Sequence, residues 1–246
     1  MNIAIDIGNT QIKLGVFVEA VLQEVLVLAK SDTQAWQKIA IKYPVQQVIV
    51  SSVADEATLL QSYFPNSNFV VFNHDTPIPI KNAYQTPHTL GLDRLAAAVG
   101  AASIHPDKSS MIIDAGSCIT LDFVKHANEY IGGVISPGLQ MRFNALYTFT
   151  EKLPLLYPDV NATMIIGDDT NTSILTGVQQ GLLEEIKGTI IRYREFYGDF
   201  SIVLCGGDAS FLERFLKNSI FAPQITQSPD LVLLGLNRIL LHNDVH

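Results

Sequence analysis

The first seventeen residues carry polar groups that could bind a phosphorylated ligand. An apolar run ends at Asp6, the small residues Gly8-Asn9-Thr10 follow, and an alternating apolar pattern resumes at Ile12. This pattern predicts a β-hairpin. Backbone amides in a tight glycine turn can bind phosphate, and the carboxylate beside them could hold a cation through water. Taken alone, the stretch is better explained by an ordinary polar turn whose aspartate bonds its own backbone.

A second stretch repeats this arrangement. Residues 110–124 contain an apolar run, Asp114, a glycine, Ser117 and a second apolar run. Asp6 and Asp114 are 114 − 6 = 108 residues apart. A third turn, Gly206-Gly207-Asp208, lies between a predicted strand and a predicted helix; alone it would be an ordinary tight turn, but a helix N-terminus there favours an anion. Two aspartate hairpins could hold the phosphates and the metal of a nucleotide, and phosphoryl transfer needs little beyond positioning and charge neutralisation.

The elements around these turns follow an order typical of α/β proteins. We expect two similar lobes, residues 1–108 and 109–246, that face a nucleotide cleft. In the first lobe we expect three strands up to residue 29, a helix 33–43, a strand 48–53, a helix 57–63, a strand 68–72, a loop 73–87 and a helix 90–104 capped by Thr89. In the second we expect a hairpin 110–124, a strand 130–135, a helix from 139, an irregular stretch 153–167, a helix 172–196, a strand 200–205 and helices 209–216 and 229–242.

Composition excludes several classes of protein. The chain has 246 residues, 48% of them hydrophobic, which is enough for a sizeable core. Its net charge of −8 and the lack of a Lys/Arg cluster argue against nucleic acid as a partner. We expect no signal peptide and no membrane span, because charged and polar residues interrupt every apolar run. Cys118 and Cys205 form no Cys-x-x-Cys pair, which favours reduced thiols, a cytoplasmic protein and no zinc site.

Five motifs, in this order along the chain, resemble those of the type III pantothenate kinases. That family belongs to the acetate and sugar kinase, heat-shock-70 and actin superfamily, whose lobes are duplicated ribonuclease-H-like units. The resemblance covers essentially the whole chain and is more specific than any one motif. The motifs are Asp6-Ile-Gly-Asn-Thr10, Gly91-Leu-Asp-Arg94, Asp114-Ala-Gly-Ser117, Gly132-Gly-Val-Ile-Ser-Pro-Gly138 and Leu204-Cys-Gly-Gly-Asp208.

The resemblance implies ATP-dependent phosphorylation of pantothenate, the first step of coenzyme A biosynthesis. Asp93 matches the base that accepts the proton of the pantothenate hydroxyl, and Arg94 matches the arginine that binds the pantothenate carboxylate. From the residues alone, Asp93 would be a first-turn aspartate that complements the helix dipole, and Arg94 a partner in a surface ion pair. The remaining substrate-binding positions are Tyr84, Gly91, Leu92 and Thr172, of which Tyr84 and Thr172 could also be ordinary loop or cap residues.

The resemblance also assigns the nucleotide and cation positions. Asp6 would lie near Mg²⁺, Lys13 would direct its charge toward phosphate, and Asp114 would bind a monovalent cation, K⁺ or NH₄⁺. Without the family, Lys13 would be an outward residue of an alternating strand. The family further implies a homodimer, for which the helix 95–102 and the closing helix are candidate surfaces. The ATP-binding positions are Asp6, Ile7, Gly8, Asn9, Thr10, Gln11, Ile12, Lys13 and Ser117.

Some features depart from the pattern or leave alternatives open. Ser117 stands where threonine is more common, and Cys118 and Cys205 replace small or hydroxyl residues, which affects the details of the nucleotide contacts. The Walker lysine loop and Gly-x-Gly-x-x-Gly are absent, which argues against P-loop and Rossmann proteins. One alternative is a non-catalytic, nucleotide-responsive switch of the same fold. Another is a kinase or phosphatase that acts on a different small molecule, such as a sugar or polyphosphate.

Overall fold

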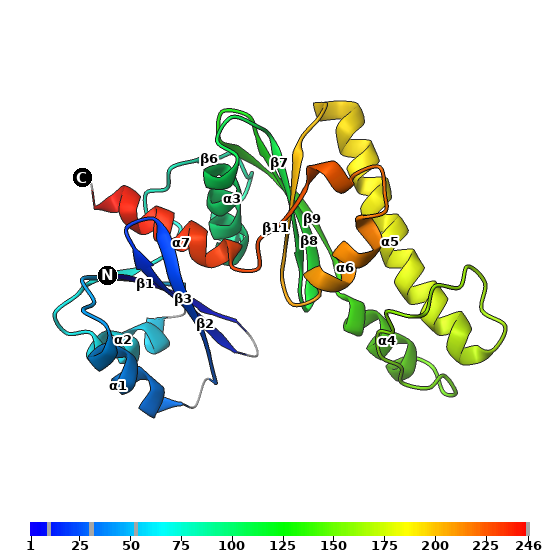
Figure 1. The fold of residues 1–246 in the computed structure, drawn as a ribbon, viewed down its shortest axis with the longest axis horizontal. Coiled ribbons are helices and arrows are strands. Elements are labelled where there is room, and N and C mark those ends of the chain that lie inside the picture. Colours follow the sequence, from blue (N-terminus) through cyan, green and yellow to red (C-terminus); the bar gives the residue numbers. More distant parts are fainter. Residues whose placement is uncertain (9–10, 30–31, 52–53, 245–246) are drawn as a thin grey trace. The chain divides into compact units, whose positions relative to one another are not determined.

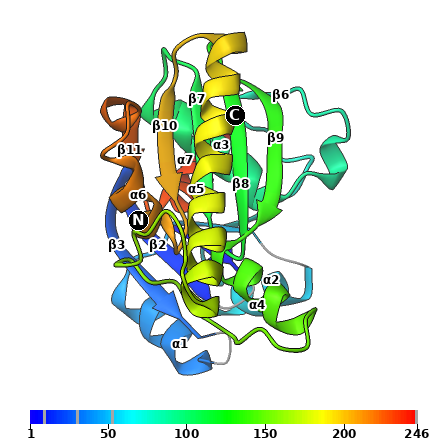
Figure 2. The ribbon, with the colours of Figure 1, turned by 90° about the vertical axis from the view of Figure 1, so that its right-hand side faces the viewer.

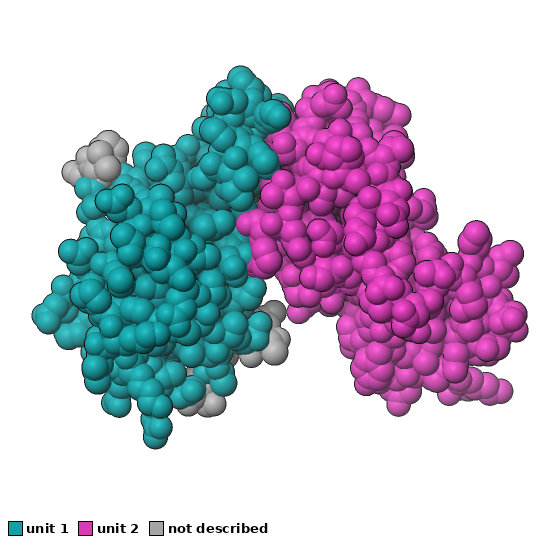
Figure 3. All heavy atoms as spheres, viewed as in Figure 1, with its two compact units in different colours: residues 1–108, 124–132, 230–246 teal, residues 109–123, 133–229 magenta. Residues whose placement is uncertain are grey.

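The computed structural model describes residues 1–8, 11–29, 32–51 and 54–244. It contains two β-sheets with helices, so the predicted α/β class is confirmed (Figure 1). The contacts within the chain define two compact units (Figure 3). Unit 1 comprises residues 1–108, 124–132 and 230–246, and unit 2 comprises residues 109–123 and 133–229.

Unit 1 is built on a five-stranded sheet with the strand order β3-β2-β1-β4-β5. Strands β1, β2 and β3 pair antiparallel, whereas β1, β4 and β5 pair parallel. Backbone and side chains of the central strands are buried on both faces, as expected for a sheet that helices cover on both sides. The strands are β1 (Asn2–Ile7), β2 (Ile12–Val18), β3 (Val21–Leu28), β4 (Gln47–Ser51) and β5 (Asn68–Val71).

Helices α1 (Thr33–Lys42) and α2 (Ala54–Tyr63) cover one face of this sheet (Figure 1). Ile3 and Ile5 of β1 join a buried cluster with Trp36 of α1 and Leu60 of α2. The predicted helices and strands of this region are therefore confirmed, with ends that differ by a few residues. The predicted loop 73–87 contains a short strand, β6 (Lys81–Asn82), and runs into a 3₁₀ helix, Pro87–Thr89.

Helix α7 (Leu231–Asn243) contacts β1, β2 and β4 and packs closely against α3 (Leu92–Ile104). Their contact depends on two glycines: a Cβ atom at Gly235 would lie 1.8 Å from the Ala96 carbonyl oxygen, and one at Gly100 would lie 2.5 Å from that of Leu231. Residues 94–102 are all buried. The helix 95–102, which the sequence offered as a dimer surface, is therefore interior packing within one chain.

The start of α3 differs from the sequence prediction. Thr89 was expected to cap the helix, but Gly91 is the N-cap residue and Thr89 belongs to the preceding 3₁₀ helix. The Thr89 hydroxyl donates to the Thr86 carbonyl oxygen at 2.9 Å. This local bond satisfies the threonine within its own turn, which is a common alternative to capping.

Unit 2 repeats the order of the first sheet. Its strands lie in the order β11-β10-β7-β8-β9, which is the order of unit 1 read from the other edge, and β6 pairs with the outer side of β9. This common order supports the predicted duplication. The strands are β7 (Ser110–Ala115), β8 (Cys118–Lys125), β9 (Glu129–Pro137), β10 (Ser201–Cys205) and β11 (Ile225–Gln227), the last of which was not predicted.

Three helices accompany this sheet: α4 (Leu139–Thr148), α5 (Thr170–Tyr197) and α6 (Ala209–Leu216). Helix α5 runs along the sheet (Figure 2), and its Tyr193 and Tyr197 rings lie 5.6 and 4.8 Å from the Phe123 ring of β8. No helix in the described ranges is long and apolar enough to cross a membrane.

The two units are not simply the first and second halves of the chain. The predicted boundary after residue 108 separates them in sequence, whereas residues 124–132 and 230–246, which we placed in the second lobe, cluster with unit 1. Packing explains both assignments. Helix α7 packs on β1 and α3 of unit 1. The start of β9 pairs with β6, where Lys81 lies opposite Glu129.

Gly235→Ala should destabilise unit 1. The new methyl group would overlap the Ala96 carbonyl oxygen, so α7 would have to move away from α3, at a cost of about 3 kcal/mol. Thermal and urea unfolding followed by circular dichroism would measure this. Gly188→Ala in α5 is the matched control, because no atom lies within 4 Å of the added group and alanine favours a helix by about 1 kcal/mol. Equal stability of the Gly235→Ala variant and the wild type would contradict the packing described.

Candidate functional site

The first aspartate hairpin joins β1 to β2 in unit 1. Asp6 and Lys13 are direct partners across the antiparallel pair, and Asp6 also lies beside Ser51 on the parallel neighbour β4. Beyond them the chain closes with the Gly8 amide donating to the Gln11 carbonyl oxygen at 3.1 Å. A carboxylate and an ammonium group therefore flank the hairpin turn, with both side chains partly exposed.

The other predicted nucleotide positions of this hairpin differ in exposure. Ile12 is buried in the sheet, Ile7 and Gly8 are partly exposed, and Gln11 is exposed. Ile12 therefore has a core role, and only its backbone could face a ligand. Asn9 and Thr10, which were also predicted to bind ATP, lie outside the described residues.

The second aspartate hairpin joins β7 to β8 in unit 2, and two glycine turns pack against it. A Cβ atom at Gly206 would lie 2.4 Å from the Asp114 Oδ1 atom and 2.4 Å from the Ala115 carbonyl oxygen, and Gly206 has φ of +90°. On another side, the Gly138 amide donates to the Ser117 carbonyl oxygen at 3.1 Å. The structure thus brings together the third, fourth and fifth of the five motifs, which lie far apart in sequence.

Parallel pairing explains how the Gly206 turn reaches this hairpin. Strands β7 and β10 run parallel with Asp114 opposite Cys205, so their carboxyl ends meet at one edge of the sheet. The Asp208 amide then donates to the Ala115 carbonyl oxygen at 2.8 Å. Burial raises the pKa of the Asp208 carboxyl group. The Asp114 carboxylate and the Ala115 carbonyl both face the space at Gly206, and oxygen atoms of these kinds suit hard cations.

Among the residues that the structure describes, no group of three or more His, Cys, Asp or Glu side chains could hold a metal ion by itself. Cys118 is exposed at the start of β8, and Cys205 is buried at the end of β10.

The start of α3 carries the predicted base. Asp93 is exposed in the first turn, and its Oδ1 atom accepts from the Arg94 amide at 2.8 Å. A Cβ atom at Gly91 would lie 2.5 Å from that same Oδ1 atom. Glycine at position 91 therefore leaves the space that the Asp93 carboxylate occupies.

Arg94, the next residue, is close to Tyr84 from the loop before α3. The Arg94 guanidinium carbon lies 5.9 Å from the centre of the Tyr84 ring, and Arg94 is only 9% exposed. The same ring packs on Gly132, which has φ of +114° and would place a Cβ atom 3.3 Å from the ring. Tyr130 supports it from 6.2 Å between ring centres. Unit 1 thus places three of the predicted substrate residues, Tyr84, Asp93 and Arg94, around the start of α3, with Leu92 partly exposed between them.

Thr172 belongs to unit 2, where it caps α5. Its hydroxyl accepts from the Asp169 amide at 3.0 Å, and its amide donates to the Asp169 carboxylate at 2.8 Å, which together form a capping box. The hydrogen bond from the Thr172 backbone amide lowers the pKa of the Asp169 carboxyl group. The cap role that the sequence left open is therefore present.

Two contributors were missed in the sequence. Tyr130 supports Tyr84, but its place in an apolar strand gave no sign of this role. Arg142 makes hydrogen bonds to the turn that precedes α4. The sign of this role in the sequence was its position near a helix start, where the dipole disfavours a cation.

Near Arg142, a largely apolar cavity of about 1240 Å³ lies between α4 and the first half of α5. Met141, Leu146 and Ile174 are among the residues that line this cavity.

Similarity to solved structures defines the class of protein. This chain superposes on the activator of 2-hydroxyisocaproyl-CoA dehydratase from Clostridium difficile with a TM-score of 0.57 and 12% sequence identity. The match covers 98% of this chain and 94% of the activator. The inorganic polyphosphate/ATP-glucomannokinase from Arthrobacter gives a TM-score of 0.50 at 14% identity, over 98% of each chain. The fold is that of the two-lobed sugar kinases and actin-like ATPases.

Sequence similarity identifies the family within that class. The sequence model of the type III pantothenate kinases matches residues 2–192. The chain is also 42% identical over 246 residues to the type III pantothenate kinase of Christiangramia forsetii, and the match covers 99% of both proteins. The chain belongs to the type III pantothenate kinase family, as its five motifs had indicated.

Gly206→Ala should displace the second aspartate hairpin. The added methyl group would overlap Asp114 and Ala115, and alanine is strained at φ of +90°. We expect kcat/KM for ATP to fall about 100-fold, because small displacements of positioned groups have effects of this size. Steady-state kinetics would measure it. Gly207→Ala controls for stability, since no atom lies within 4 Å of its added group and its melting temperature should stay unchanged. Unchanged kinetics of the Gly206→Ala enzyme would contradict this account of the turn.

Proposed function

We propose that this chain transfers the γ-phosphoryl group of ATP to the hydroxyl of pantothenate, which begins coenzyme A biosynthesis. The carrying observation is family membership over nearly the full length, combined with the adjacent Asp93 and Arg94 at the start of α3. A base beside a cation that fits a carboxylate is what an acceptor such as pantothenate requires. The cytoplasmic location is part of the same proposal, because ATP is the phosphoryl donor.

Asp93 is the base in this proposal. It accepts the proton of the pantothenate hydroxyl as that oxygen attacks the γ-phosphorus, while the bond to the leaving oxygen of ADP breaks. The transition state is loose, so the carboxylate has mainly to orient the hydroxyl and accept its proton late. The exposure of its side chain supports access by an acceptor.

Arg94 binds the carboxylate at the other end of pantothenate. A guanidinium group has the planar fork that a carboxylate accepts in two parallel hydrogen bonds. Its low exposure and its position over the Tyr84 ring limit the orientations that it can take, which supports a specific rather than a general attraction. Gly91 and Leu92 are further positions of this acceptor site, and the family resemblance adds Thr172 of unit 2 to the proposed substrate-binding residues.

The nucleotide contacts two hairpin turns in the proposal. Asp6, Gly8 and Lys13 serve the first turn and Ser117 the second, with Ile7, Asn9, Thr10, Gln11 and Ile12 as further contacts of the first. The carboxylate of Asp6 has the oxygen chemistry that Mg²⁺ prefers, so it would hold this ion, directly or through water. Mg²⁺, when bound, neutralises charge on the phosphate oxygens. Asp114 and the Ala115 carbonyl would hold the monovalent cation, K⁺ or NH₄⁺.

The protein would act as a homodimer. The exposed apolar side chains of unit 2 support this part of the proposal: Phe149 is 85% exposed, and Ile165 and Ile166 are 89% and 81% exposed. Phe149 also lines the apolar cavity beside α4, so unit 2 presents an exposed apolar surface there. A second copy of the chain would remove it from solvent.

The switch alternative lacks an observation in its favour. A nucleotide-responsive switch needs the two hairpins but has no use for a base beside a buried arginine, and the relatives at 36–42% identity are named as kinases. A sugar kinase would be expected to present several carboxylate and amide groups to hydroxyls. The described residues around Tyr84 and Arg94 instead offer aromatic rings, one acid and one arginine.

Asp93→Asn should lower kcat about 100- to 10,000-fold, because the amide cannot accept the proton of the hydroxyl. A coupled assay of ADP release with pantothenate and ATP would measure it, with and without K⁺. Circular dichroism should show an unchanged fold, because the side chain is exposed. Asp107→Asn, an exposed aspartate just beyond the same helix, should keep normal turnover. Near-normal turnover of Asp93→Asn would contradict the proposed role. The switch alternative would be favoured if the wild type bound nucleotide but no acceptor that was tested led to the release of ADP.

Phe149→Asp should weaken the proposed dimer, because it places a charge in the exposed apolar surface of unit 2. Sedimentation equilibrium over a range of concentrations would give the dissociation constant, which we expect to rise at least about tenfold. Ile41→Asp in α1 of unit 1 is the matched control, since that side chain is equally exposed, at 85%. A wild type that stays monomeric at all concentrations would refute the dimer itself. An equal effect of both substitutions would place the interface elsewhere.

A further inference from the structure

The turn Ser136-Pro137-Gly138 touches the second aspartate hairpin backbone to backbone. Gly138 is buried, and its amide donates to the Ser117 carbonyl oxygen at 3.1 Å. A Cβ atom at position 138 would lie 2.4 Å from the carbonyl oxygens of both Gly116 and Ser117. Any movement of this turn therefore moves the hairpin turn that carries Ser117, or breaks its contact with it.

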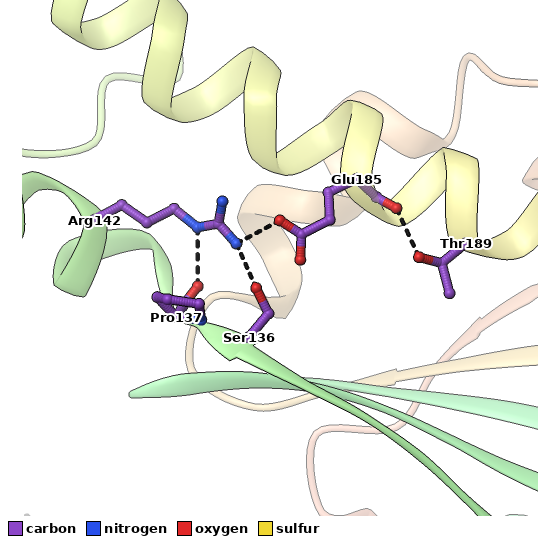
Figure 4. Close-up of polar contacts among 5 residues, drawn as sticks. All are labelled: Ser136, Pro137, Arg142, Glu185 and Thr189. Atoms are coloured by element: carbon purple, nitrogen blue, oxygen red, sulfur yellow. Dashed lines mark hydrogen bonds and ion pairs between the residues drawn. The ribbon is translucent and has the colours of Figure 1, made fainter.

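Arg142 bonds all three residues of the Ser136–Gly138 turn, and Figure 4 shows its side-chain bonds to Ser136 and Pro137. Its Nε atom donates to the Pro137 carbonyl oxygen at 2.9 Å, and its Nη2 atom donates to the Ser136 hydroxyl at 2.6 Å. Its backbone amide donates to the Gly138 carbonyl oxygen at 3.1 Å, which is a first-turn bond of α4. A lysine could not make the two side-chain bonds in this geometry, because they use separate nitrogen atoms of one planar guanidinium group.

Glu185 ties the same guanidinium group to α5. The Arg142 Nη2 atom lies 2.7 Å from the Glu185 Oε2 atom, and the two side chains are only 21% and 35% exposed. Glu185 lies near the middle of a 28-residue helix, between Leu182 and Ile186, which are fully buried. One turn further on, the Thr189 hydroxyl donates to the Glu185 backbone carbonyl at 2.8 Å (Figure 4). The anchor of Arg142 is therefore a well-packed part of unit 2.

We propose that Arg142 is a positioning residue for nucleotide binding. Arg142 connects the Ser136–Gly138 turn to α5 through its bonds to the turn and its ion pair with Glu185. Through the contact of Gly138 with Ser117, it also holds the backbone of the Gly116–Ser117 turn in place. The placement of an arginine in the first turn of α4 supports this, because the helix dipole disfavours a cation there and two side-chain bonds to the turn offset that cost. The inference rests on the proposed function in one respect, namely that the second hairpin contacts ATP.

Arg142 acts through the turn, so its loss should change ATP binding rather than acceptor binding. A residue that serves stability alone would lower the melting temperature and leave the KM for ATP unchanged. A residue that positions the hairpin would raise the KM for ATP and the dissociation constant of an ATP analogue, while the KM for pantothenate stays the same. The two outcomes are distinguishable even if both variants are less stable.

The test compares Arg142→Lys and Glu185→Gln with Lys187→Gln in the full-length enzyme. Lys187 pairs with Glu184 at 2.8 Å on the same helix and, among the described residues, makes no bond to the Ser136–Gly138 turn, so its loss should leave both KM values unchanged. Arg142→Lys should raise the KM for ATP about tenfold, the equivalent of one charge-assisted hydrogen bond, with the KM for pantothenate within about twofold. Glu185→Gln should have a smaller effect in the same direction. In the double variant that combines Arg142→Lys with Glu185→Gln, the increase in the KM for ATP should be less than additive, because both residues act through the same ion pair.

Binding of a non-hydrolysable ATP analogue, measured by calorimetry, separates this inference from the proposed function. If the wild type binds the analogue but does not phosphorylate pantothenate, the function is wrong and the analogue affinities still test Arg142. If Arg142→Lys and Glu185→Gln bind the analogue as tightly as the wild type at temperatures where both are folded, the inference is overturned. Glu185→Gln keeps the test decisive should Arg142→Lys fail to fold, because it keeps the three bonds of Arg142 to the turn.

Discussion

Backbone-to-backbone contact at a few glycines is the constraint on which both units depend. In unit 2, Gly138 and Gly206 bring two separate turns against the hairpin between β7 and β8. In unit 1, Gly100 and Gly235 bring α3 and α7 together. A side chain at any of the four would meet main-chain atoms, which cannot move aside as a flexible side chain can. The direction of each amide in the turns follows from these contacts, and those amides are what a phosphate group would meet.

The two sheets share one strand order, and their aspartates occupy matching places in it. Asp6 and Asp114 are each the last but one residue of the central strand of their sheet, and each lies beside a parallel neighbour. Parallel neighbours direct their carboxyl ends to the same edge, where loops can converge on a ligand. The duplication thus yields two turns of similar chemistry. They differ in what supports them: the second turn is held by two glycine contacts and by the Arg142 link.

The sequence predicted the α/β order and the two hairpins well, because alternation and glycine turns are local signals. It also singled out Tyr84, Asp93 and Arg94, which the fold places around one helix start. The capping residue of α3 was predicted two residues too early, since threonine bonds within the preceding turn instead. The short strands β6 and β11 were missed, as pairings of two and three residues leave no periodic pattern.

Other parts of the site could not be predicted, because they depend on contacts between distant residues. Gly132 is required by the Tyr84 ring, 48 residues earlier, and Arg142 is held by Glu185, 43 residues later. No local pattern encodes either pair. The assignment of the last segment to unit 1 has the same origin. It rests on a helix crossing that becomes visible only when both helices are folded.

Helix α7 makes unit 1 discontinuous, and this governs the order in which the protein can fold. Gly100 and Gly235 meet although 135 residues separate them, and all of residues 133–229 of unit 2 lie between the two. During synthesis on the ribosome, α3 and one face of the first sheet stay uncovered until nearly the last residue has emerged. Unit 2 has its whole sequence before then. The unit that is translated first is therefore completed last, and an incomplete chain exposes the apolar face that α7 will cover.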